Sequence, residues 1–115
     1  MKMSIETKDS ILVAQVEETQ IGADSAEEFK STILAELPTE RGRLAVNLSK
    51  VDFVDSSGLG ALVSLLKAVR PGGEMVLFGM KSSVQEILRL THLDAVFNCK
   101  SDEGEALEAL SSPGF

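Results

Sequence analysis

The chain has 115 residues, of which 43% are hydrophobic, and its formal net charge is −7, from 18 acidic and 11 basic residues. This length suits one domain, and the hydrophobic content is sufficient for a packed core. The excess of acidic residues excludes the basic patch that nucleic-acid binding requires, and it disfavours binding to an anionic membrane. With five Phe and no Trp or Tyr, the chain also lacks a surface for stacking bases. A protein partner is therefore expected.

The sequence also indicates a compartment. No apolar run approaches the roughly 20 residues that span a bilayer, and the N-terminus lacks an apolar segment followed by a small-residue cleavage site. Cys99 is the single cysteine, so it cannot form an internal disulfide and is expected to be a small packed side chain. The expected compartment is the reducing cytoplasm.

The N-terminal part predicts a hairpin followed by a helix. Residues 11–16 are apolar and rich in β-branched side chains, and residues 4–7 alternate weakly before them, so both are expected to be strands. Asp24 is the expected N-cap of the helix, with Glu27 three residues later completing a capping box. Pro38 is expected to end this helix, because proline cannot continue it.

A strand and a long helix are expected in the middle of the chain. Residues 44–48 form the strand, and the helix runs from about residue 57 to residue 70, before a proline and two glycines. Ser56 precedes the apolar stripe of this helix and is expected to be solvent-accessible at its N-terminus. The residues of the stripe that are expected to be buried are Leu59, Leu62, Val63 and Leu66.

The last third of the chain predicts two more strands and two more helices. Residues 75–78 are an uninterrupted apolar run, as expected for a strand that is covered on both faces. Ser83 and Glu86 predict a second capping box at the start of a helix. Residues 95–98 are expected to be a short last strand, and Ser101 is expected to cap a final helix.

Strands that alternate with helices of this length predict an α/β fold. The connections are long enough for right-handed crossovers between parallel strands, and the N-terminal hairpin adds one antiparallel pair. The expected architecture is one domain with a mixed, mostly parallel sheet, an N-terminal hairpin and about four helices.

The segment from residue 55 to residue 60 reads Asp-Ser-Ser-Gly-Leu-Gly, where a loop after a strand becomes a helix. A hydroxyl at that place lies beside the positive end of the helix dipole and beside unpaired backbone N–H groups, which together favour a phosphate. The plain alternative is a capped helix start, in which Asp55 is an ordinary capping residue. Gly58 and Gly60 are poor helix formers, so either another chain approaches closely here or the helix packs tightly on the sheet.

Together with the preceding Val-Asp-Phe loop, this segment resembles the signature of STAS domains. It is most similar to the signature of the small stand-alone anti-sigma factor antagonists of bacteria. In that family the serine directly after the aspartate is phosphorylated by an anti-sigma factor that is also a kinase, and the corresponding residue here is Ser56. The resemblance implies a STAS domain over residues 1–110, and residues 111–115 are expected to be a flexible C-terminal tail.

The resemblance also implies a function. The chain would be an anti-sigma factor antagonist that binds a serine/threonine kinase anti-sigma factor and releases it when Ser56 is phosphorylated, with a phosphoserine phosphatase as a further candidate partner. It would be a substrate and a binding module, not an enzyme, with no cofactor and no metal. The loop at Gly22 departs from the Leu-Asp or similar acidic pair of many family members, which bears on partner identity more than on fold. The implied partner-binding residues are Asp55, Ser57, Gly58, Gly60, Gly22 and Asp24.

Two alternatives stay open at this point. One is a STAS subunit of another signalling or lipid-transport complex. The other is an aspartyl-phosphate receiver with Asp52 or Asp55 as the acceptor, although Lys100 is followed by serine and not by the usual proline.

Other kinds of site are not expected. A dinucleotide-binding fingerprint would need a third glycine at position 63, where the chain has Val63. His92 is the one histidine, so neither a serine hydrolase nor a metal site is expected.

Overall fold

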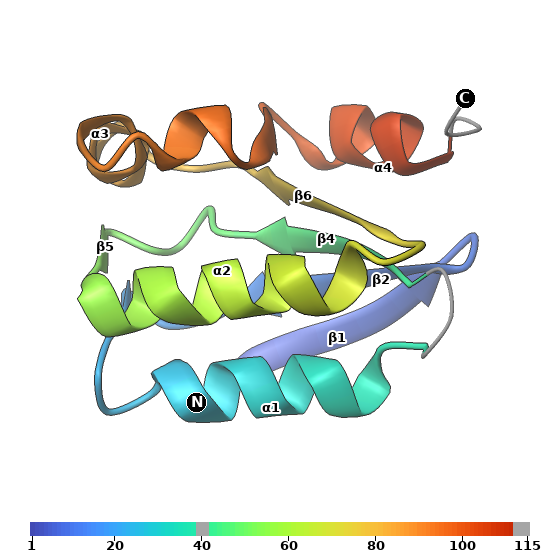
Figure 1. Ribbon diagram of the computed structural model, residues 1–115, viewed down its shortest axis with the longest axis horizontal. Helices are drawn as coiled ribbons and strands as arrows, with labels where there is room; N and C mark the ends of the chain where they lie inside the picture. The colour runs from blue at the N-terminus through green and yellow to red at the C-terminus, as the bar shows by residue number, and fades with distance from the viewer. Residues whose placement is uncertain (39–41, 112–115) are drawn as a thin grey trace.

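The computed structural model describes residues 1–38 and 42–111, which form a five-stranded sheet covered by helices on both faces (Figure 1). The strand order is β1-β2-β4-β6-β7, with β1 antiparallel to β2 and the other neighbours parallel. The predicted mixed, mostly parallel sheet with an N-terminal hairpin is confirmed. The strands are β1 (Met3–Lys8), β2 (Ile11–Val16), β4 (Arg43–Asn47), β6 (Glu74–Phe78) and β7 (Asn98–Lys100).

The helices divide between the two faces of the sheet. Helices α1 (Ala26–Glu36), α2 (Ser56–Val69) and α3 (Ser82–Leu90) contribute to the larger core on one face, and Figure 1 shows α1 and α2 side by side. Helix α4 (Glu103–Ser111) covers the other face through Ala106 and Leu110. Central strands are therefore apolar on both faces, which explains their continuous apolar sequences.

A second, two-stranded sheet lies beyond the end of the main sheet. Strand β3 (Gln20–Ile21) pairs in parallel with β5 (Phe53–Val54). The backbone N–H groups of Asp52 and Phe53 both donate to the Thr19 carbonyl, at 2.6 and 3.3 Å. This small sheet joins the loop that follows β2 to the loop that follows β4, and it was not predicted.

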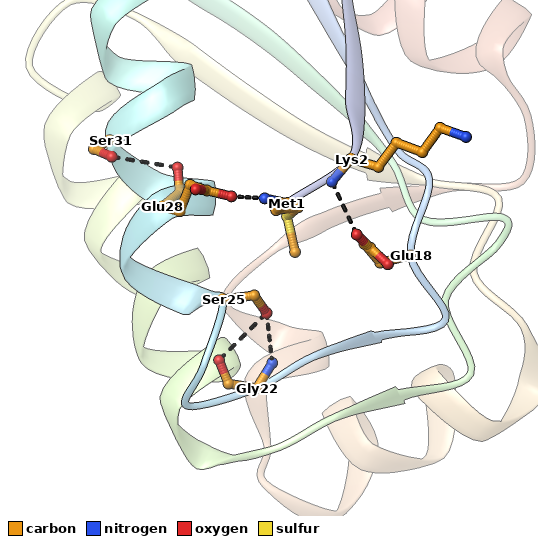
Figure 2. A network of polar contacts seen from close by, with 7 residues as sticks. All are labelled: Met1, Lys2, Glu18, Gly22, Ser25, Glu28 and Ser31. Carbon is orange, nitrogen blue, oxygen red and sulfur yellow. Dashed lines mark hydrogen bonds and ion pairs between the residues drawn. The ribbon is translucent and has the colours of Figure 1, made fainter.

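The predicted capping box at the start of α1 is wrong. Ser25 and not Asp24 is the N-cap, and no side chain caps this helix. The Ser25 hydroxyl instead accepts a hydrogen bond from the Gly22 N–H at 3.2 Å, because the chain turns sharply before the helix (Figure 2). Figure 2 also shows the Met1 amino group paired with Glu28 of α1.

The second predicted capping box is wrong as well. Lys81 is the N-cap of α3, again without a side-chain cap. The Ser83 hydroxyl donates to the backbone carbonyl of Asp52 at 2.8 Å, so it ties α3 to the loop that precedes α2. A serine near a helix start has thus been used for a tertiary contact and not for a local one.

The last strand and the last helix begin later than predicted. Residues Leu93–Ala95 form a short 3-10 helix, and the backbone N–H groups of Val96 and Phe97 both donate to the Leu93 carbonyl. Those groups are therefore unavailable for strand pairing, and β7 starts at Asn98. At α4, Asp102 and not Ser101 accepts the capping hydrogen bond, from the Glu105 N–H at 2.8 Å.

The C-terminal end was predicted as a tail from residue 111. Ser111 is the last residue of α4, and residues 112–115 lie outside the described residues. Within the described part of the chain, no helix has the length and apolar character needed to cross a membrane.

Candidate functional site

The site predicted from the sequence lies at the end of the molecule where the parallel strands finish. The chain leaves β4, passes through β5 and enters α2 at Ser56. In Figure 1, β5 and the first turns of α1 and α2 lie together at the left end. Loops that are distant in the sequence therefore meet around the start of α2.

Asp55 holds two of these loops together. Its Oδ1 accepts a hydrogen bond from the Gly58 N–H at 3.0 Å, which caps α2, and its Oδ2 accepts one from the Ala23 N–H at 3.1 Å. The backbone N–H of Asp55 also donates to the Ile21 carbonyl at 3.2 Å. One carboxylate therefore fixes the helix start against the loop before α1, in addition to the predicted capping role.

Gly22 allows this close approach. A Cβ at position 22 would lie 3.0 Å from Asp55 Oδ2. Gly22 itself is buried, and Asp24 is exposed two residues later in the same loop. Asp24 can therefore contact a partner directly. Gly22 cannot, and its role is to let Asp55 lie close to the loop before α1.

Ser56 and Ser57 are the first two residues of α2, and both are exposed. Neither hydroxyl has a hydrogen-bond partner in residues 1–38 or 42–111. Because Asp55 satisfies the N–H groups of Gly58 and Leu59, those of Ser56 and Ser57 are left at the exposed positive end of the helix. The predicted exposure of Ser56 is confirmed.

The apolar stripe of α2 is rotated slightly from the predicted one. Leu62 and Leu66 are buried as predicted, whereas Leu59 and Val63 are only partly buried at the edge of the core. Ala61 and Leu65 take part in the buried face instead. The rotation follows from Gly58, which is buried against β3 and β5 and so turns that side of the helix inward.

The two glycines of the first turns have different surroundings. A Cβ at Gly58 would lie 2.3 Å from the Ile21 carbonyl oxygen and 2.6 Å from Val54 Cγ1, so tight internal packing explains this glycine. Gly58 is therefore not an exposed contact for a partner. A Cβ at Gly60 would meet nothing within 4 Å, so nothing in the described chain requires a glycine there.

Gly60 lines a shallow hollow of about 350 Å³ between α1 and α2. The side chains around it are mostly small, and its rim carries the Lys30–Glu27 ion pair, with 3.4 Å between Nζ and Oε2. Ser57 lies at the end of the hollow nearest the helix start. The exposed glycine and the hollow together leave room for another chain to approach the backbone of α2.

The structure adds neighbours that the sequence did not reveal. Lys81 Nζ lies 2.6 Å from Asp52 Oδ1, at the start of α3. Phe53 is 50% exposed in β5, three residues before Ser56. The Val-Asp-Phe residues predict a loop. The contacts of this loop with residues 19–21 and 81–83 could not be predicted, because these residues are distant from it in the sequence.

Cys99 and His92 are the one cysteine and the one histidine of the chain. Burial raises the pKa of the half-buried Cys99 thiol, so the thiol form is favoured, as expected for a packed side chain. His92 is exposed in a left-handed turn before the 3-10 helix. Among the residues that the structure describes, no three His, Cys, Asp or Glu side chains could jointly hold a metal ion.

The chain is similar to proteins of one family, both in sequence and in structure. The STAS domain profile matches residues 2–106. The anti-sigma-B factor antagonist of Listeria monocytogenes is 31% identical over 112 residues, which cover 91% of this chain and 95% of that protein. An anti-sigma-factor antagonist (STAS) domain protein from Planctomyces limnophilus superposes with a TM-score of 0.87 at 25% identity, over 96% of this chain and 98% of that one.

A third comparison concerns the fold alone. The phosphorylated form of the Bacillus cell fate determinant SpoIIAA superposes with a TM-score of 0.66 at 16% identity, over 94% of this chain and 98% of that chain. These similarities favour the STAS interpretation of the site over the receiver interpretation.

Proposed function

The chain belongs to the STAS domain family, and on this premise we propose that it acts as an anti-sigma factor antagonist in the cytoplasm. Its partner in this proposal is an anti-sigma factor that is also a serine/threonine kinase. The unphosphorylated chain binds this partner, and phosphorylation of Ser56 releases it. A phosphoserine phosphatase reverses the modification. The chain is a binding module and a substrate, so the ATP is bound by the kinase.

The observation that carries this proposal is the exposure of the Ser56 hydroxyl at the N-terminus of α2. It follows directly after Asp55, which is fixed by two side-chain hydrogen bonds, so the serine is held on an ordered backbone. A kinase can reach an exposed hydroxyl without unfolding the domain. Ser57, Gly60 and Asp24 lie around it and form the proposed partner surface, with Asp55 and Gly22 supporting it.

The electrostatics of the site support release without refolding. A phosphate adds about −1.5 to −2 charges near neutral pH, to a chain of net charge −7. At an exposed helix N-terminus this charge is stabilising by about 0.3–1 kcal/mol. Against an acidic kinase site or a bound nucleotide the same charge is repulsive and obstructs close contact. The affinity for the partner should change, and the fold should not.

The experiment that tests the proposal starts with a pull-down of the kinase partner from extract of the source cell. The purified chain, the captured kinase and ATP are incubated, and the modified residue is located by mass spectrometry. We expect one phosphate on Ser56 that resists neutral hydroxylamine, because a phosphoserine is stable to it and an acyl phosphate is not. Ser56→Ala should abolish the modification, and Ser57→Ala should leave it in place.

A hydroxylamine-labile phosphate on Asp52 or Asp55, formed with acetyl phosphate and Mg²⁺, would instead establish receiver chemistry. The absence of any captured kinase would argue for a STAS subunit of a different complex.

A further inference from the structure

Phe53 is unusual among the phenylalanines of the structure. Its side chain is 50% exposed, whereas Phe29, Phe78 and Phe97 are at most 5% exposed. Phe115 lies outside the described residues. A large aromatic side chain that is half in water forgoes part of the free energy that its burial would contribute. The described chain leaves this half of the side chain uncovered.

The backbone that carries Phe53 is firmly held. In β5 it pairs with Gln20 of β3, and its N–H donates to the Thr19 carbonyl at 3.3 Å. The preceding residue, Asp52, is fixed by Lys81 Nζ at 2.6 Å and by the Ser83 hydroxyl at 2.8 Å. An aromatic ring on an ordered backbone has little conformational entropy to lose on binding, which favours its use as a binding anchor.

Phe53 is also close to Ser56. Three residues of chain span at most about 11 Å, whereas a standard protein–protein interface covers about 800 Å² on each partner, equivalent to a disc of radius about 16 Å. An interface of this size centred on Ser56 therefore extends far enough to include Phe53. Residues that dominate binding energy are enriched in large anchors near the centre of such interfaces.

From these observations we propose that Phe53 is an anchor of the partner interface and enters an apolar pocket on the protein that docks over Ser56. The inference rests on the proposed function, since it takes the kinase anti-sigma factor as the occupant. The neighbouring Asp52–Lys81 ion pair has no net charge, so the rim of the partner's pocket need not carry a compensating charge. The anchor role of Phe53 goes beyond the proposed function, because it assigns much of the binding affinity to a residue outside the serine-glycine segment.

The test measures the affinity of the pulled-down partner for Phe53→Ala by titration calorimetry. We expect the Kd to rise by at least about 30-fold, the effect of losing a strong interface anchor. Phe53→Tyr keeps an aromatic strand residue and adds one hydroxyl, so it should weaken binding as well, with a native circular dichroism spectrum and an unchanged melting temperature. The matched control is Leu90→Ala, which removes a 65%-exposed apolar side chain from the end of α3 and should change the Kd less than threefold.

Ser56→Asp is measured in parallel and separates this inference from the proposed function. If Ser56→Asp weakens binding while Phe53→Ala and Phe53→Tyr bind like the wild type, the anchor role is refuted and the proposed function stands. If all three variants bind like the wild type, the proposed function itself is refuted. Equal losses for Leu90→Ala and Phe53→Ala would also refute the anchor role, because they would show a general sensitivity to lost apolar surface.

Discussion

Gly58→Ala is expected to lower the free energy of unfolding by about 1–3 kcal/mol, the typical cost of forcing an extra methyl group into a packed site. The added Cβ would lie 2.3 Å from the Ile21 carbonyl oxygen and 2.6 Å from Val54 Cγ1. The first of these atoms is backbone in β3, so α2 must shift away from the small sheet to relieve the clash. Urea unfolding followed by circular dichroism measures the change.

The matched control is the same substitution two residues later. Gly60→Ala adds a Cβ with no neighbour within 4 Å, so it should raise the free energy of unfolding by about 0.5–1 kcal/mol through helix propensity. Gly104→Ala in α4, where the nearest atom is Asp102 Oδ1 at 3.4 Å, should be stabilising for the same reason. If Gly58→Ala and Gly60→Ala had the same effect, Gly58 would not pack closely against Ile21 and Val54 in solution.

Gly60→Ala and Gly104→Ala also test the proposed partner surface. Both variants are expected to be at least as stable as the wild type, but only position 60 lines the hollow between α1 and α2. If a partner approaches the backbone there, Gly60→Ala weakens its binding and Gly104→Ala does not. Wild-type affinity for Gly60→Ala would remove this glycine from the partner surface.

Asp55→Ala is expected to destabilise the protein by about 1–2 kcal/mol, because it removes the N-cap of α2. The same substitution breaks the hydrogen bond from the Ala23 N–H to Oδ2, so the loop before α1 loses its attachment to α2. Asp55→Asn should lose less, since its side-chain oxygen can still cap the helix. Thermal unfolding gives the stability, and amide hydrogen exchange at Ala23 reports the attachment directly.

The control for this prediction is Asp24→Ala. The sequence suggested Asp24 as an N-cap, but no side chain caps α1, so the free energy of unfolding should change by less than about 0.5 kcal/mol. A loss at Asp24 as large as that at Asp55 would contradict the capping arrangement of the structure.

The parts of the fold that the sequence predicted depend on local patterns. Apolar runs marked β2, β4 and β6, because the strands are covered on both faces. The exposure of Ser56 followed from the change from polar residues to a helical apolar stripe. The serine-glycine segment also indicated the family, which the similarity to STAS proteins confirms.

The parts that the sequence did not predict depend on contacts between distant residues. Strands β3 and β5 have two residues each, which is too short for any periodicity to be visible. Ser25 replaces Asp24 as the N-cap of α1, and its hydroxyl bonds to Gly22. Ser83 was expected in a capping box, but its partner in the folded chain is the Asp52 carbonyl. The different surroundings of Gly58 and Gly60 could be recognised only from the packing of α2 on the small sheet.

We predict that charge on Ser56 controls partner affinity and leaves the fold unchanged. The most direct test of this prediction is titration calorimetry of the partner with the wild type, the chain phosphorylated on Ser56, Ser56→Ala and Ser56→Asp. Ser101→Asp is the matched control, because it adds the same charge at an exposed position just before α4. We predict wild-type affinity for Ser56→Ala and Ser101→Asp. For the phosphorylated chain and Ser56→Asp we predict at least tenfold weaker binding, with melting temperatures between that of the wild type and about 5 °C above it. Equal affinity of the wild type, the phosphorylated chain and Ser56→Asp would show that charge on Ser56 does not control binding, even if Ser56 proves to be the modified residue.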